Sequence, residues 1–119
     1  MSTRSDEESA TLLQGLRQPG AVREAAITRL HSLLLRVARA EAGRRRSQLP
    51  DRVREEVDDL CVQAANDATM SILRKLDDFR GTARFTTWAC KFVIFEASTR
   101  LRRHAWRHRA VESSAAIWD

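Results

Sequence analysis

Arginines and aromatic residues alternate between Phe79 and Arg109, and these side-chain types together can bind nucleic acid. Eight cations and one acid lie between residues 79 and 110, namely Arg80, Arg84, Lys91, Arg100, Arg102, Arg103, Arg107 and Arg109 against Glu96. The formal charge of this segment is therefore +7, whereas the whole chain of 119 residues carries +5 and the remainder sums to −2. Positive charge concentrated on one loop and one helix is typical of a nucleic-acid surface.

The contacts that these residues can make favour an unpaired strand. Arginine and lysine bind phosphates, and an unstacked base can lie on an aromatic ring for about 1–3 kcal/mol. The helix behind the loop could also follow a duplex groove. The candidate DNA-binding residues are Phe79, Arg80, Arg84, Phe85, Thr86, Thr87, Lys91, Arg100, Arg103 and Arg107. Two alternatives stay open, because Phe79 and Phe85 could instead fix the loop to the core and the arginines could be a solvated face.

The polar residues contain no catalytic constellation. The serines lack a paired histidine and acid, and no glycine-rich phosphate loop is present. Cys61 and Cys90 have no neighbours spaced for zinc, so we expect structural thiols in a reducing cytoplasm. His104 and His108, one helical turn apart among arginines, favour phosphate contact over a metal. We therefore expect no enzyme activity, no cofactor and no metal.

The loop and the helix that position the basic residues have clear boundaries. Asp77 and Asp78 interrupt the preceding helical pattern, and Gly81 can adopt a turn conformation that other side chains resist. A hydroxyl from Thr86 or Thr87 can cap the next helix. Apolar residues predict the inward face of that helix, namely Trp88, Phe92, Ile94 or Phe95, and Leu101.

Three earlier helices are predicted from the apolar spacing. A capping box at Ser5 opens a short helix that ends at Pro19, a second helix runs from Ala21 to about Arg45, and a third runs from Asp51 to Leu76. The second helix has Val22, Ala26, Leu30, Leu33 or Leu34, and Val37 inward, and the third has Val53, Val57, Leu60, Ala64, Ala68, Ile72 and Leu76 inward. Leu35 lies outside the inward face predicted for the second helix. It could be an ordinary exposed leucine or part of a surface that binds a partner.

Only four glycines and two prolines occur, and no alternating strand pattern is present. The predicted fold is therefore all-α, a compact bundle of three main helices plus a short N-terminal helix. The chain also has no N-terminal signal pattern and no long apolar run, so we expect a cytoplasmic protein without a membrane segment.

Three short runs give the chain a family resemblance. Leu76-Asp77-Asp78-Phe79-Arg80-Gly81, Arg84-Phe85-Thr86-Thr87-Trp88 and Arg100-Leu101-Arg102-Arg103 follow one another at characteristic spacing. In this order they resemble region 2 of extracytoplasmic-function sigma factors, over about residues 8 to 110. The resemblance implies a helical specificity subunit that binds the clamp helices of bacterial core RNA polymerase. It also implies promoter DNA as a partner, with non-template bases of the minus-ten element held outside the stack.

The same resemblance makes the helix from Asp51 to Leu76 the polymerase-docking element. Its candidate polymerase-binding residues are Asp59, Gln63, Asn66, Asp67, Met70 and Arg74. Family members often have Gln-Glu where Asn66 and Asp67 stand here, and an asparagine where Phe95 and Glu96 stand. Residues 1–110 would be the domain, and residues 111–119 would begin a linker to a helix-turn-helix domain that this chain does not contain.

Two other functions remain open from the sequence. A basic helical module could bind nucleic acid without polymerase, or the same face could be held by an acidic protein partner such as an anti-sigma factor.

Overall fold

Helices form nearly all of this computed structural model, which describes residues 3–49 and 54–118. In order these are α1 (Thr3–Leu16), α2 (Ala21–Arg44), the 3-10 helix η1 (Arg46–Gln48), α3 (Arg54–Arg74), the 3-10 helix η3 (Leu76–Asp78) and α4 (Phe85–Trp118). Neither of the two described ranges contains a strand. The predicted all-α bundle of three main helices and a shorter N-terminal helix is confirmed.

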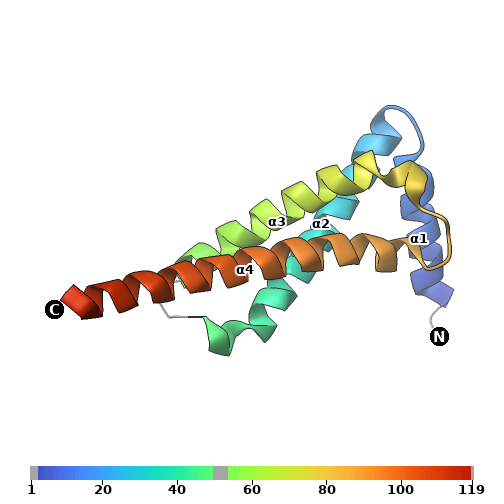
Figure 1. Ribbon diagram of the computed structural model, residues 1–119. Helices are drawn as coiled ribbons and strands as arrows, with labels where there is room; N and C mark the ends of the chain where they lie inside the picture. Colours follow the sequence, from blue (N-terminus) through green and yellow to red (C-terminus); the bar gives the residue numbers. More distant parts are fainter. Residues whose placement is uncertain (1–2, 50–53, 119) are drawn as a thin grey trace.

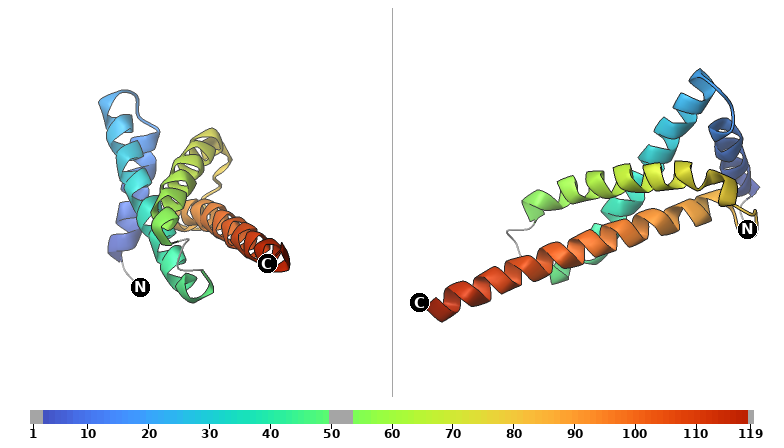
Figure 2. Two further views of the ribbon diagram at one scale, coloured as in Figure 1. Left: turned by 90° about the vertical axis from the view of Figure 1, so that its left-hand side faces the viewer. Right: turned by 45° about the horizontal axis from the view of Figure 1, so that its top comes forward.

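The helices α3 and α4 run antiparallel and side by side, joined by η3 and the loop that follows it (Figure 1). Helix α2 crosses and contacts both of them, and α1 packs against α2 and against the start of α4 (Figure 2). The molecule measures 60 × 32 × 23 Å, and its long dimension follows α4, whose C-terminal end projects past the other helices (Figure 1). None of the described helices has the length and apolar character needed to cross a membrane.

Small residues line the contacts between the helices. Among the described side chains nine alanines are buried, namely Ala26, Ala38, Ala42, Ala64, Ala65, Ala68, Ala89, Ala97 and Ala105. Between them lie the larger side chains Leu16, Leu30, Leu34, Ile72, Val93 and Leu101. Alanine leaves room for two helices to approach closely, so the larger side chains can interlock across short distances. An added methyl group in these seams has little free space to enter.

The predicted inward faces of α2 and α3 are largely confirmed. Buried positions among those predicted are Ala26, Leu30, Leu34, Ala64, Ala68, Ile72 and Leu76, whereas Leu33, Val37, Val57 and Leu60 are half-buried. Val53 lies outside the described residues. The inward prediction for Val22 is wrong, since its side chain is 56% exposed. The prediction that Leu35 lies outside the inward face is also wrong, because its side chain is half-buried against the core.

The inward face of α4 differs from the prediction. The buried residues recur every fourth position, namely Phe85, Ala89, Val93, Ala97, Leu101 and Ala105. Leu101 was predicted correctly, and Trp88 and Phe92 are half-buried against the core. The prediction that Ile94 or Phe95 faces inward is wrong, since 38% and 65% of their surfaces are exposed. The prediction followed the large residues, but the small alanines are the ones that face the neighbouring helices.

The start of α4 is capped by a distant residue. Thr86 and Thr87 lie inside the first turn, so the predicted cap by their hydroxyls is wrong. Instead the buried Ser9 of α1 accepts a hydrogen bond at its Oγ from the Thr86 backbone N–H at 3.3 Å, and the two hydroxyls lie 2.7 Å apart. Before the helix, Gly81 has φ of 76°, which confirms its predicted turn role.

The end of α4 lies beyond the predicted domain boundary. Its backbone stays helical to Trp118, through residues 111–118 where the sequence predicts a linker. The stretch contains no glycine or proline to stop the helix. Its role as a link to another domain stays a prediction.

Candidate nucleic-acid interface

Four aromatic rings pack together where the loop meets α4. Phe79 lies 5.5 Å from Phe85 and 5.2 Å from Trp88 between ring centroids, and Trp88 lies 4.9 Å from Phe92. Phe85 is only 2% exposed, whereas Phe79, Trp88 and Phe92 are half-buried. The ring of Phe85 therefore belongs to the core, and the rings of the other three hold the loop against the helix.

This packing divides the predicted loop residues into two groups. Phe85 and Thr86 are engaged inside the protein, the first in the core and the second with Ser9. Arg80 and Thr87 are exposed. The side chain of Arg84 is 49% exposed and forms an ion pair of 3.6 Å with Asp6 of α1. Among the predicted residues, the guanidinium groups of Arg80 and Arg84 are thus at the surface of the loop and the Thr87 hydroxyl is exposed in the first turn of α4, while the Phe85 ring predicted for the rim is buried.

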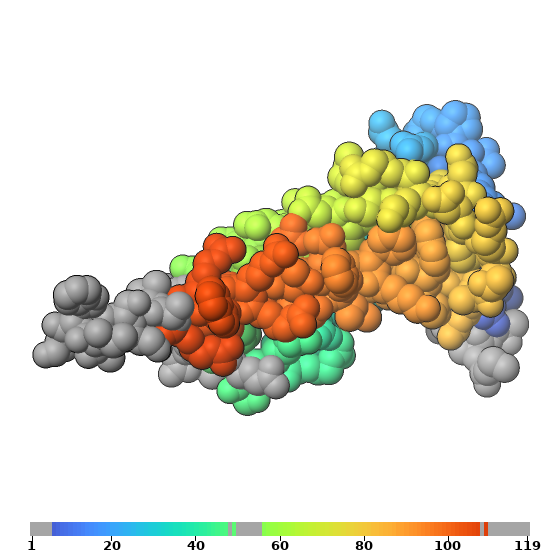
Figure 3. All heavy atoms as spheres, in the orientation of Figure 1, coloured from blue at the N-terminus to red at the C-terminus, as the bar shows by residue number. Residues whose placement is uncertain are grey.

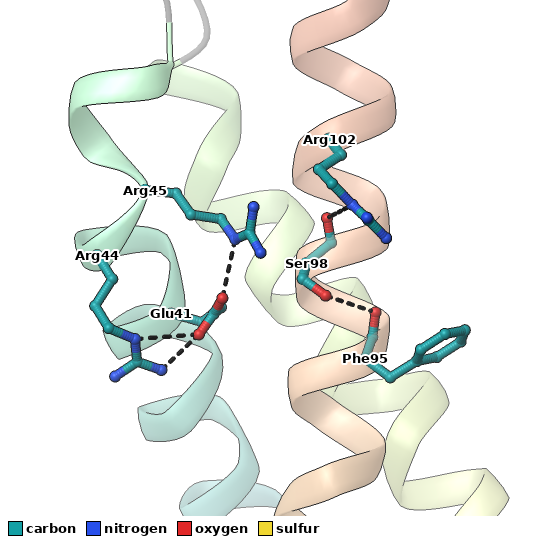
Figure 4. A network of polar contacts seen from close by, with 6 residues as sticks. All are labelled: Glu41, Arg44, Arg45, Phe95, Ser98 and Arg102. Carbon is teal, nitrogen blue, oxygen red and sulfur yellow. Dashed lines mark hydrogen bonds and ion pairs between the residues drawn. The ribbon is translucent and has the colours of Figure 1, made fainter.

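The outer side of α4 is a long basic face. Lys91 is exposed near its start, and four exposed arginines gather toward its C-terminal half, namely Arg102, Arg103, Arg107 and Arg109. The exposed apolar residues Ile94 and Phe95 lie between these two groups. In Figure 3 the arginine-rich part of α4 forms the surface on this side of the molecule. Arg102 also donates from Nε to the Ser98 carbonyl at 3.3 Å, which lays its side chain along the helix (Figure 4).

Arg100 is set apart from that face. Only 23% of its side chain is exposed, and its guanidinium is bonded to Asp67 of α3 and to Glu96 one turn earlier on α4. A predicted DNA contact and a predicted polymerase contact are therefore bonded to each other. In this state the charge of Arg100 joins α3 to α4 instead of facing solvent.

The six predicted polymerase-binding residues share one property. Asp59, Gln63, Asn66, Asp67, Met70 and Arg74 are all exposed. Met70, near the C-terminal end of α3, is 54% exposed. The amide oxygen of Asn66 lies 2.7 Å from Nε2 of His31 on α2. These six positions on the outward side of α3 are thus polar except for Met70, which lies near the C-terminal end of the helix.

Histidine and cysteine take positions away from the basic face. His104 is half-buried and pairs with Glu56 of α3, so its imidazole faces an acid rather than the solvent side. The side chain of His108 lies outside the described residues. Cys61 is buried and Cys90 is half-buried, and burial raises the pKa of both thiols. Both stay protonated near neutral pH.

The arginines at the end of α2 are partly neutralised. Glu41, of which only 8% is exposed, accepts hydrogen bonds from Nη2 of Arg44 at 2.5 Å and Nε of Arg45 at 2.9 Å (Figure 4). The bond from Arg44 is the main reason that the pKa of Glu41 is lowered. Arg46 in η1 is exposed.

Sequence reasoning missed the most exposed aromatic side chains. Trp106 is 68% exposed and Phe95 65% exposed, both on the outer side of α4. A signal was available for Trp106, because its position lies half a turn out of phase with Ala97 on a 3.6-residue helix. Comparison with protein-family models, curated proteins and solved structures finds no match to this chain.

Proposed function

We propose that this chain is the region 2 domain of a bacterial sigma factor, which binds core RNA polymerase and opens the minus-ten element of a promoter. The single observation that carries the proposal is the pairing of two different faces on adjacent antiparallel helices. The outward side of α3 is polar with Met70 exposed, and the outward side of α4 is basic. The loop that joins these helices contains the motif Phe79-Arg80-Gly81 on which the sequence resemblance depends.

The two faces suit two partners. Protein interfaces favour an apolar anchor with a polar surround, which Met70 and its neighbours on α3 provide. Phosphates favour arginine and lysine, which α4 provides. Because one rigid pair of helices presents both faces, polymerase bound at α3 would fix the position of DNA along α4.

The loop residues have separate roles in this mechanism. Arg80 and Arg84 would bind the phosphates on either side of an extruded non-template base. Phe79, the aromatic residue of the loop, is half-buried against Trp88 and so keeps part of its ring exposed. Phe85 would act from the core by fixing Phe79 and Trp88 rather than by touching a base.

The test is binding of the chain to core RNA polymerase or to its isolated clamp-helix fragment. We expect saturable one-to-one binding, lost in the double variant Gln63→Arg plus Met70→Glu. These positions are preferable to Asp67, whose ion pair with Arg100 would also be broken. The matched control is Val22→Glu, which places an acid at another exposed apolar residue, on α2. No binding by the unmodified chain, or equal loss in the control, would refute the proposal.

The anti-sigma alternative predicts a different result. An acidic protein partner would cover α4, so its capture of the chain would depend on Arg103 and Arg107 and would prevent polymerase binding.

A further inference from the structure

Trp106 stands out among the large apolar residues because it contributes almost nothing to the core. It is 68% exposed and belongs to the side of α4 that faces away from the buried stripe. On a 3.6-residue helix, Arg102 and Arg109 lie to one side of position 106, while Arg103 and Arg107 lie to the other. The indole is thus flanked by two guanidinium groups on each side.

These side chains enclose a shallow hollow on the helix surface. Its volume is about 670 Å³, and it is lined by Thr99, Arg102, Arg103, Trp106, Arg107 and Arg109. No acid among the described side chains lines the hollow, and Arg102, Arg103, Arg107 and Arg109 form no ion pair with a residue that the structure describes. Four positive charges gathered at one hollow favour an anionic ligand.

We propose that this hollow is a binding site for single-stranded nucleic acid, with a base stacked on Trp106 and phosphates bound by the four arginines. The arginines span about 10 Å along the helix axis, which is enough for two or three consecutive phosphates. A single strand is favoured over a duplex because the faces of paired bases are covered by their neighbours, whereas an unpaired base has a free face.

This site is separate from the loop that carries the sigma-like motif. Residues 85 and 106 lie about 30 Å apart along the axis of α4. A strand bound at Trp106 therefore lies at a different place from a base bound at the loop. Its binding does not require polymerase. It shares Arg103 and Arg107 with the basic face that the proposed function assigns to DNA, and adds to that face a stacking position at Trp106.

The experiment measures binding of a labelled oligothymidylate of twenty nucleotides to the 119-residue chain by fluorescence anisotropy, over a series of salt concentrations. We expect Trp106→Ala to raise the Kd by about 5- to 150-fold, the effect of one lost stack. The slope of log K against log salt should stay unchanged, because no phosphate contact is lost. Trp106→Phe should retain most of the affinity.

The arginine variants, unlike Trp106→Ala, should change the salt dependence of binding. Arg103→Gln and Arg107→Gln should each make the slope shallower by about 0.7, the value for one phosphate contact on a single strand. The matched control is Phe95→Ala, which removes an equally exposed aromatic residue from the same helix and should leave the Kd unchanged. Circular dichroism melts would verify that each variant folds like the parent chain.

Several results would overturn the proposal. Equal affinity of Trp106→Ala and the parent would mean that no base stacks there, and an equal loss with Phe95→Ala would mean that the effect is not local. The same dependence on Trp106 for a duplex would refute the preference for a single strand. Loss of polymerase binding in Trp106→Ala with unchanged oligonucleotide binding would assign the hollow to a protein partner. A chain that binds oligothymidylate through Trp106 but not polymerase would sink the proposed function and leave this site standing.

Discussion

Replacing Asp67 with asparagine should strengthen the binding of nucleic acid, although Asp67 lies on α3 and the basic face lies on α4. In the folded chain Asp67 holds the guanidinium of Arg100, which also bonds to Glu96. Asparagine keeps the shape of the side chain and removes its charge. Arg100 would then lose one of its two acidic partners and could reach a phosphate.

The magnitude follows from counting one added contact. One phosphate contact to a single strand steepens the slope of log K against log salt by about 0.7, which corresponds to about fivefold tighter binding at 0.1 M salt. The cost in stability should be below about 1 kcal/mol, because the side chain of Asp67 is 57% exposed and Arg100 retains Glu96. Oligothymidylate anisotropy in a salt series gives the slope, and urea denaturation gives the free energy of unfolding.

The matched control is Asp59→Asn, on the same helix. Asp59 is exposed, loses the same charge, and makes no ion pair with the described part of the chain. If Asp59→Asn and Asp67→Asn tighten binding equally, the effect is one of net charge and the reasoning about Arg100 is refuted. An unchanged slope in Asp67→Asn would refute it as well.

Three further predictions concern stability and reactivity. Ser9→Ala should lower the free energy of unfolding by about 1 kcal/mol and speed amide exchange at Thr86, because the first turn of α4 loses its cap; unchanged exchange there would contradict this. Glu41→Gln should cost about 1 kcal/mol near pH 7 by urea denaturation. Arg44 lowers the pKa of Glu41 below its usual value of 4.5. The difference in free energy of unfolding between the parent and Glu41→Gln should therefore be fully present above pH 4.5 and vanish as the pH falls further. A difference that persists in acid would contradict this. Iodoacetamide at neutral pH should label Cys90 slowly and Cys61 only in urea, since burial raises both pKa values; mass spectrometry would detect the order, and faster labelling of Cys61 would overturn it.

The sequence was sufficient for the number and order of the helices, because apolar residues at helical spacing and a few glycines and prolines define them locally. Leu30, Leu34, Ala68 and Ile72 were placed in the core on that basis, and all are buried. The six outward positions of α3 were chosen from the family resemblance, and all six are exposed. The continuation of α4 to Trp118 had a local signal too, in the absence of a helix breaker after residue 110.

Features that depend on distant partners could not be predicted in this way. The cap of α4 comes from Ser9, which is 77 residues away from Thr86, and the partner of Arg100 on α3 is 33 residues away. Phe85 is buried at the start of α4, the part of that helix against which α1 packs through Ser9. The alanine stripe of α4 was missed because alanine is too small to mark a face until the neighbouring helix is in place.

The contact between Ser9 and Thr86 also bears on the order in which the chain assembles. Helix α1 leaves the ribosome before α4, and Thr86 at the start of α4 emerges 77 residues after Ser9. Before then α1 can pack only on α2, where Gly15 allows a close approach to Ala26. Contacts between such distant residues form late, since a long segment must first be closed. The packing of α1 is therefore completed by one of the last contacts to form, at the start of α4.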